Sequence, residues 1–163
     1  MKGYLHAYVF PILLGCFLAS APSTESNLED FRIITFEEFE GMMTEPSEKI
    51  RVFNFWATWC APCVKEMPYF ESVAADNGDL ELVFISMDDS RNPERVTSFM
   101  GKRGIQNPVY LLNDVDYDKW INKVSPKWSG AIPATLFIKP NGEKVFHEGE
   151  VSEEELLSLI SSL

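Results

Sequence analysis

Trp59-Cys60-Ala61-Pro62-Cys63 joins a predicted buried strand to a predicted helix. Residues 50–57 form a nearly continuous run of apolar, β-branched and aromatic residues, which is typical of a central strand buried on both faces. Residues 61–76 favour a helix that ends at Asn77-Gly78. The two cysteines therefore lie where a strand passes into the N-terminus of a helix.

This position favours thiol chemistry at Cys60. The unpaired backbone N–H groups and the dipole at a helix N-terminus favour negative charge, so we expect the Cys60 thiolate to be stabilised there. Cys63 follows nearly one turn later and can attack a mixed disulfide formed by Cys60, which completes a two-electron exchange. Pro62 falls in the first turn, where its missing N–H costs little and its fixed φ helps hold the two sulfur atoms close.

Three other interpretations of the cysteine pair fit the sequence less well. A structural zinc site needs four ligands, and the chain offers three cysteines and two histidines, of which His6 lies within the first 21 residues. Covalent haem attachment requires a histidine after the second cysteine, where Val64 stands. A purely structural disulfide at this spacing closes a very small loop and adds little stability. We therefore expect a redox-active disulfide, with no metal and no cofactor.

Strand and helix patterns alternate along the rest of the chain. Capping-box pairs mark the first and last helices, at Thr35 with Glu38 and at Ser152 with Glu155. The sequence predicts further strands at residues 31–34, 80–87, 109–112, 134–138 and 144–147, and a turn at Pro140-Asn141-Gly142 joins the last two. It predicts further helices from Thr35 to about Met43, at 116–124 and after Ser152. Another helix begins at Asn92-Pro93-Glu94, with Asn92 as its cap. This order implies an α/β fold with a mixed sheet and helices on both faces.

The N-terminal segment, residues 1–21, reads as an export signal with Lys2 as its only fixed charge. Cleavage, retention as a membrane anchor, and lipidation at Cys16 all stay open, because Leu13-Leu14-Gly15-Cys16 resembles the bacterial lipoprotein signal while the apolar run continues past Cys16. Residues 22–30 read as a polar linker, and residues 31–163 as one domain.

Composition supports a globular domain and argues against one class of partner. Apolar residues make up 45% of the chain and charged residues 24%, which is enough for one core and a polar surface. The net charge is −11, with 14 basic residues scattered among 25 acidic ones. A nucleic-acid partner is therefore not expected, because phosphate contacts require clustered lysine and arginine.

The active-site segment of the TlpA/ResA-like branch of the thioredoxin superfamily resembles residues 53–68, Phe53-Asn54-Phe55-Trp56-Ala57-Thr58-Trp59-Cys60-Ala61-Pro62-Cys63-Val64-Lys65-Glu66-Met67-Pro68. The resemblance extends to Gly130-Ala131-Ile132-Pro133-Ala134-Thr135, which is similar to the cis-proline loop of that family, and covers residues 31–163. It implies a thioredoxin-like fold with an extra strand and helix in residues 88–130, where Phe99, Trp120 and Trp128 either line a substrate groove or, as is more common for such aromatics, belong to the core.

The resemblance also implies roles for single residues. Cys60 matches the attacking thiol, Cys63 the resolving thiol, and Pro133 a cis-proline that faces the disulfide, with Ile132 offering backbone hydrogen bonds to a bound substrate segment. The alternative for Pro133 is an ordinary proline at a strand edge. Trp59 matches the aromatic residue that flanks the site, and its alternative is a plain packing residue.

Acid-base help is expected from Glu66 rather than from the strand. Asn54 stands where classical thioredoxin has a buried aspartate, and an asparagine cannot accept a proton. Glu66 matches an acidic residue that TlpA/ResA-like proteins carry one turn beyond the resolving cysteine, and it would tune Cys63 or relay its proton. The alternative for Glu66 is a solvated charge on the outer face of the helix.

The expected function is that of a thiol-disulfide oxidoreductase outside the cytoplasm, in the bacterial periplasm or envelope, either soluble or attached to the membrane through its N-terminus. The resemblance implies a reductase that is kept reduced by a membrane thiol donor and cleaves disulfides in exported proteins, in cytochrome c maturation or in broader envelope thiol repair. Two alternatives stay open. A disulfide oxidase or isomerase would use the same residues, since CxxC potentials span roughly −270 to −120 mV, and a redox-silent module would bind extended peptides.

Overall fold

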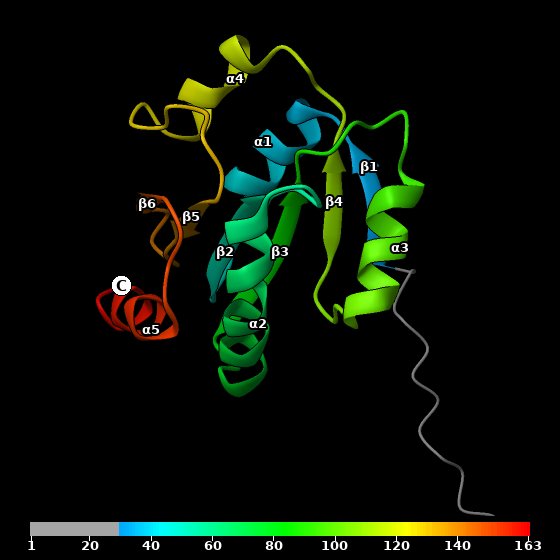
Figure 1. Ribbon diagram of the computed structural model, residues 1–163. Coiled ribbons are helices and arrows are strands. Elements are labelled where there is room, and N and C mark those ends of the chain that lie inside the picture. Colours follow the sequence, from blue (N-terminus) through cyan, green and yellow to red (C-terminus); the bar gives the residue numbers. More distant parts are fainter. Residues whose placement is uncertain (1–29) are drawn as a thin grey trace, which may run out of the picture.

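The computed structural model describes residues 30–163, whose centre is a six-stranded mixed sheet (Figure 1). The strands are β1 (Phe31–Ile34), β2 (Ile50–Trp56), β3 (Leu80–Ser86), β4 (Val109–Leu112), β5 (Ala134–Ile138) and β6 (Lys144–Glu148). They lie in the order β1-β4-β3-β2-β5-β6, parallel from β1 to β2 and antiparallel from β2 to β6. The predicted export signal, Cys16 and all of the predicted linker except Asp30 lie outside the described residues.

Five helices cover the two faces of this sheet in the described part of the chain. They are α1 (Phe36–Thr44), α2 (Ala61–Asp76), α3 (Glu94–Arg103), α4 (Tyr117–Val124) and α5 (Glu153–Ser161). Buried residues of α2, α3 and α5 pack in one apolar cluster, and those of α1 and α4 pack in another. The expected α/β class and its order of strands and helices are therefore confirmed. No helix within residues 30–163 is both long enough and apolar enough to cross a membrane.

Alternate residues of β2 enter the two clusters. Val52 and Trp56 belong to the cluster under α2, whereas Phe53 and Phe55 belong to the cluster under α1. Asn54 faces the same side of the sheet as Val52 and Trp56, because side chains alternate along a strand with a period of two. Its side chain accordingly donates a hydrogen bond to Glu66 of α2. The strand is buried on both sides, which explains its nearly continuous apolar sequence.

The local start signals of the helices are confirmed at two places and wrong at a third. Thr35 and Ser152 cap α1 and α5 with the expected reciprocal bonds to Glu38 and Glu155. Asn92 does not cap α3, whose N-cap is Pro93 without a side-chain bond. The Asn92 amide nitrogen donates to the Asp89 carboxylate at 3.3 Å, whereas a cap would require the amide oxygen to accept from a backbone N–H of the helix.

Residues 88–130 contribute α3, β4 and α4 between β3 and β5, which is compatible with the extra strand and helix expected there. Trp120 and Trp128 are 1% and 4% exposed and pack edge to face in the cluster under α1. They belong to the core and do not line a groove. Phe99 is partly buried and packs against Trp56, with ring centres 5.0 Å apart.

Candidate active site

The two cysteines lie at the C-terminal end of β2, where the chain turns and enters α2. Cys60 is the N-cap of α2, and its sulfur accepts a hydrogen bond from the backbone N–H of Cys63 at 3.4 Å. The structure joins Cys60 and Cys63 in a disulfide with an S–S distance of 1.99 Å. Cys60 is 5% exposed and Cys63 is 0% exposed, so an external partner has access only to the first of the two.

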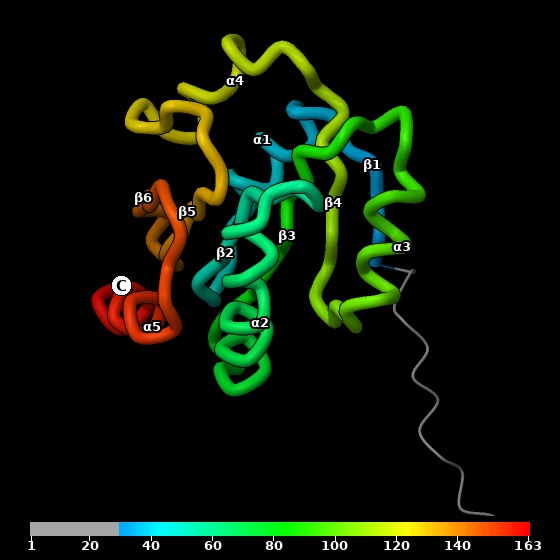
Figure 2. The backbone as a smooth tube through the Cα atoms, viewed as in Figure 1, coloured from blue at the N-terminus to red at the C-terminus, as the bar shows by residue number. Residues whose placement is uncertain are grey.

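The loop that precedes β5 also lies beside the disulfide. β5 begins opposite the last residues of β2, since Ala134 pairs with Phe55, so both connections lie at the same end of the sheet (Figure 2). The peptide bond between Ile132 and Pro133 is cis, which confirms the predicted geometry. The Ile132 carbonyl oxygen lies 3.8 Å from Cys60 Sγ, where it can accept the S–H of a reduced Cys60.

An exposed apolar surface borders the disulfide. Trp59 is 62% exposed directly before Cys60, and Ala61 and Pro62 are exposed in the first turn of α2. Trp59 therefore does not pack in the core, and its indole ring is free to contact a partner. Pro62 lies at the expected place, in a turn whose first N–H groups have no partner within a helix.

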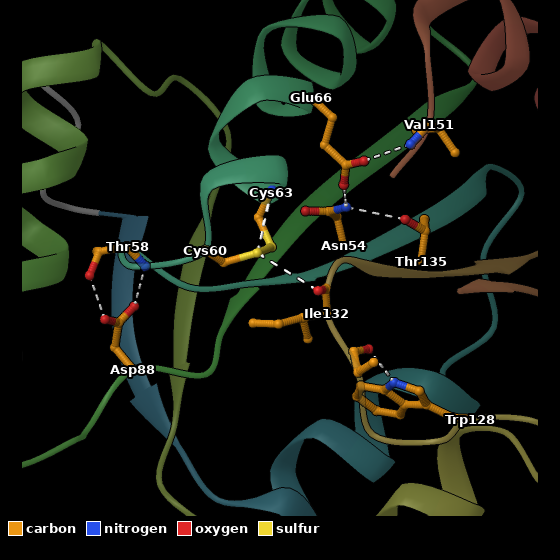
Figure 3. The surroundings of a disulfide bond; sticks show 11 residues. Asn54, Thr58, Cys60, Cys63, Glu66, Asp88, Trp128, Ile132, Thr135 and Val151 are labelled. Carbon is orange, nitrogen blue, oxygen red and sulfur yellow. Dashed lines mark hydrogen bonds between the residues drawn. A yellow bond between two sulfur atoms is a disulfide. The ribbon is translucent and has the colours of Figure 1, made fainter. Parts of the chain in front are cut away.

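Glu66 is fully buried, so the structure excludes a solvated charge. Its carboxylate accepts hydrogen bonds of 2.9 Å from the Asn54 side-chain amide and 2.9 Å from the Val151 backbone N–H (Figure 3). Burial raises the pKa of Glu66 to about 7, although both hydrogen bonds act in the opposite direction. A carboxyl group with this pKa exchanges a proton near neutral pH, as a general acid or base must.

Asn54 links this carboxyl group to the strand that follows the cis-proline. Its amide nitrogen donates to Glu66 and also to the Thr135 hydroxyl at 3.1 Å, and the Asn54 side chain is 0% exposed. Its amide oxygen has no hydrogen-bond partner among residues 30–163. Asn54 thus holds Glu66 in place under the first turns of α2 but takes no proton itself.

A second buried carboxylate near the disulfide was not predicted. Asp88 lies two residues beyond the end of β3, is 4% exposed, and accepts hydrogen bonds from Thr58 in the turn before Cys60. An acidic residue directly after a buried strand was the available signal, because the ends of adjacent parallel strands meet at one edge of the sheet. Within residues 30–163 no group of three or more His, Cys, Asp or Glu side chains could hold a metal ion.

Comparisons with known proteins agree with this geometry. A model of the AhpC/TSA family matches residues 19–145. The chain is 29% identical over 131 residues to the thiol-disulfide oxidoreductase ResA of Halalkalibacterium halodurans, covering 76% of this chain and 71% of that protein. It is 36% identical over 94 residues to ResA of Oceanobacillus iheyensis, covering 56% of this chain and 45% of that protein, so it spans about half of that relative's length.

A solved structure supports the same fold. The secreted disulfide oxidoreductase of Mycobacterium tuberculosis superimposes with a TM-score of 0.57 at 26% sequence identity, covering 72% of this chain and 84% of that one. The similarity spans most of both chains, as expected for one shared domain.

Proposed function

Because the chain belongs to the AhpC/TSA family and is a thioredoxin-like thiol-disulfide oxidoreductase, we propose that it reduces disulfides in exported proteins through Cys60 and Cys63. One observation carries the proposal: the more accessible sulfur of the disulfide lies at the N-terminus of α2, within 3.8 Å of the Ile132 carbonyl. The helix terminus stabilises a thiolate there, and the cis-proline loop offers backbone groups to an extended substrate segment.

The proposed reaction has two exchange steps. The Cys60 thiolate attacks one sulfur of a substrate disulfide, forms a mixed disulfide and releases the other substrate sulfur as a thiolate. Cys63 then loses its proton and attacks Cys60 Sγ, which forms the Cys60–Cys63 disulfide and releases the second substrate thiolate. The substrate gains two electrons and the enzyme loses two. An external dithiol must return them before the next turnover.

Glu66 supplies the proton acceptor for the second step in this proposal. Cys63 is fully buried and cannot lose its proton directly to bulk water. Glu66 lies one helical turn beyond Cys63 and has a pKa of about 7, so its ionised form is available at neutral pH to take that proton. Asn54 and Val151 hold its two oxygen atoms.

The proposed setting is outside the cytoplasm, in the bacterial periplasm or envelope. Residues 1–21 read as an export signal, and the similar M. tuberculosis oxidoreductase is described as secreted. In this setting a membrane thiol donor would keep the dithiol reduced, and the substrates would be disulfide-containing exported proteins, such as apocytochrome c or proteins with misformed disulfides.

Two cysteine variants test the catalytic assignment. We expect Cys60→Ser to abolish the reduction of insulin disulfides, whereas Cys63→Ser should accumulate mixed disulfides with substrate, visible on non-reducing gels. The trapped species forms because the attacking thiol remains and the resolving thiol is gone. Full function of Cys60→Ser would favour the redox-silent peptide-binding module instead.

The direction of electron flow is tested separately, by equilibrating the purified domain with glutathione buffers. A reductase is expected to have a potential near the thioredoxin value of about −270 mV, and an oxidase near about −120 mV. Quantifying the reduced fraction by thiol labelling gives the potential. A value at the oxidising end would replace the reductase by the oxidase or isomerase, with the same residues in the site.

A further inference from the structure

Asp88 forms a network of hydrogen bonds beneath the turn that carries Cys60. Its carboxylate accepts from the Thr58 backbone N–H at 2.8 Å, from the Thr58 hydroxyl at 2.6 Å and from the Ser86 hydroxyl at 2.9 Å. The Asp88 backbone N–H in turn donates to the Ser86 hydroxyl at 3.2 Å. All of these partners are uncharged, so this buried charge is held by hydrogen bonds rather than by an ion pair.

Thr58 is the point at which this network reaches the dithiol. The chain leaves β2 at Trp56, and the Cys60 backbone N–H donates back to the Ala57 carbonyl at 3.1 Å, which closes a tight turn around Thr58. The Met87 N–H donates to the Trp56 carbonyl at 2.8 Å, so the segment after β3 also fixes the start of the turn. Figure 3 shows Asp88 and Thr58 on one side of the disulfide and Glu66 on the other.

We propose that Asp88 is a positioning residue for Cys60, which acts through Thr58 to fix the turn that places the Cys60 sulfur at the N-terminus of α2. The stabilisation of a thiolate by a helix terminus acts over the first turn only and depends on alignment with the free N–H groups. A turn held at both Thr58 donors keeps Cys60 Sγ aligned with the Cys63 N–H.

Asp88 acts on the pKa of the Cys60 thiol in two ways that have opposite signs, so the direction of the change in a variant distinguishes them. A negative charge near the sulfur disfavours a second negative charge, so removal of the carboxylate charge alone would lower the pKa of the Cys60 thiol. Loss of alignment would raise the pKa of that thiol. We expect the alignment of Cys60 Sγ to affect the pKa of its thiol more than the charge of Asp88 does. Three hydrogen-bond donors point at the Asp88 carboxylate and weaken its electric field at the sulfur.

The experiment measures the rate at which iodoacetamide alkylates Cys60 in the reduced protein as a function of pH. In Asp88→Asn, one side-chain oxygen is replaced by an N–H₂ group, so at least one of the three donors loses its acceptor. We expect the midpoint of the profile to rise by about one pH unit, with an alkylation rate at pH 7 about tenfold lower. The reduction potential should become more negative, since the reduced form loses thiolate stabilisation.

Glu71→Gln is the matched control. Glu71 also holds a loop through a carboxylate, accepting from the backbone N–H groups of Gln106 and Asn107 and from the Asn107 side chain, but that loop follows α3, away from the dithiol. We expect its alkylation profile to match that of the unmodified protein. Glu66 titrates near the site as well and is retained in every variant, so its contribution cancels in the comparison.

An unchanged midpoint in a folded Asp88→Asn protein would overturn the proposal, and so would a lowered midpoint, which would show that Asp88 acts by its charge. Thr58→Val provides the test if Asp88→Asn does not fold, because it removes only the hydroxyl bond and keeps the backbone bond. Its midpoint should rise by a smaller amount, and no rise would overturn the proposal. This inference rests on the proposed function of Cys60 as the attacking thiol. The alkylation experiment uses no protein substrate, so a negative result would overturn the role of Asp88 and would leave the assignment of the substrates untouched.

Discussion

Glu66 is a titratable group enclosed by the fold, and its burial couples the ionisation of one side chain to the stability of the whole domain. In the unfolded chain its pKa is near the ordinary value of 4.5, and in the folded protein it is raised to about 7. The folded state therefore holds this proton over a pH range in which the unfolded state has lost it. For such a group, stability is fully present below the lower pKa and is lost as the pH rises through the higher one.

From this difference we expect the oxidised protein to lose stability between pH 5 and pH 8. The change in the free energy of unfolding attributable to Glu66 is on the order of 2–3 kcal/mol. Urea unfolding of the oxidised protein at several pH values measures it without interference from the thiols. Glu66→Gln should show a flatter dependence on pH, because a glutamine stays neutral. Its single side-chain oxygen can accept only one of the two hydrogen bonds, so the comparison uses the slope with pH and not the absolute stability.

The same variant tests the role of Glu66 in exchange. If Glu66 accepts the Cys63 proton, Glu66→Gln should shift the pH profile of substrate reduction and lower the rate of the second step by about 10²-fold or more. Stopped-flow kinetics of the mixed disulfide separate this step from the first. An unchanged profile would remove Glu66 from the mechanism while leaving its structural effect intact.

Single residues also show where sequence reasoning succeeds and where it stops. Cys60 and Cys63 lie in one short motif, so their type and spacing were sufficient to select them, whereas Pro133 followed from the resemblance to a known family. Asp88 was missed because its partner Thr58 is 30 residues away, and the Val151 N–H that holds Glu66 is 85 residues away in the chain. Such contacts depend on strand order, which the two side chains alone do not reveal.

At the scale of elements, helix starts are encoded locally and were predicted well. The capping boxes of α1 and α5 each involve residues three positions apart, so sequence shows the whole interaction. Asn92 was assigned wrongly because its residue type and the proline after it suit a helix start, whereas its side chain bonds back to Asp89, three residues earlier. The mixed order of the strands was less accessible, since it depends on which of several buried strands pair.

The α5 cap carries an element-scale prediction. Ser152→Ala should lower the free energy of unfolding by about 1 kcal/mol, because it removes the hydroxyl that accepts from the Glu155 N–H. Urea denaturation measures the loss. Ser158→Ala is the matched control, since Ser158 is exposed inside the same helix, where alanine is a better helix former. An equal loss in both variants would contradict the capping assignment.

At the scale of the whole molecule, the sheet divides the interior into two apolar clusters. The dithiol, Glu66 and Asn54 lie on the side of α2, whereas Phe39 lies on the side of α1 with its ring edge-on to Phe53 and Phe55 at 5.2 and 5.5 Å. The core was the more common of the two places that the sequence allowed for Trp120 and Trp128, and the structure places both in the second cluster.

This division predicts that stability and redox properties can be separated. Phe39→Leu should destabilise the domain by about 1–2 kcal/mol through loss of packing in a fully buried site. Its reduction potential and Cys60 alkylation profile should equal those of the unmodified protein. A shifted potential in a folded Phe39→Leu protein would show that the two sides of the sheet are coupled.

The alternation of β2 has a consequence for how this chain can change over time. Every second residue of the strand faces the layer that holds the dithiol and Glu66, and the residues between them face the other layer. Substitutions can accumulate at the positions that face the other layer, and be compensated there by neighbours in α1 and α4, without disturbing the reacting atoms. A protein engineer can therefore redesign that layer for thermal tolerance while keeping the catalytic layer as inherited.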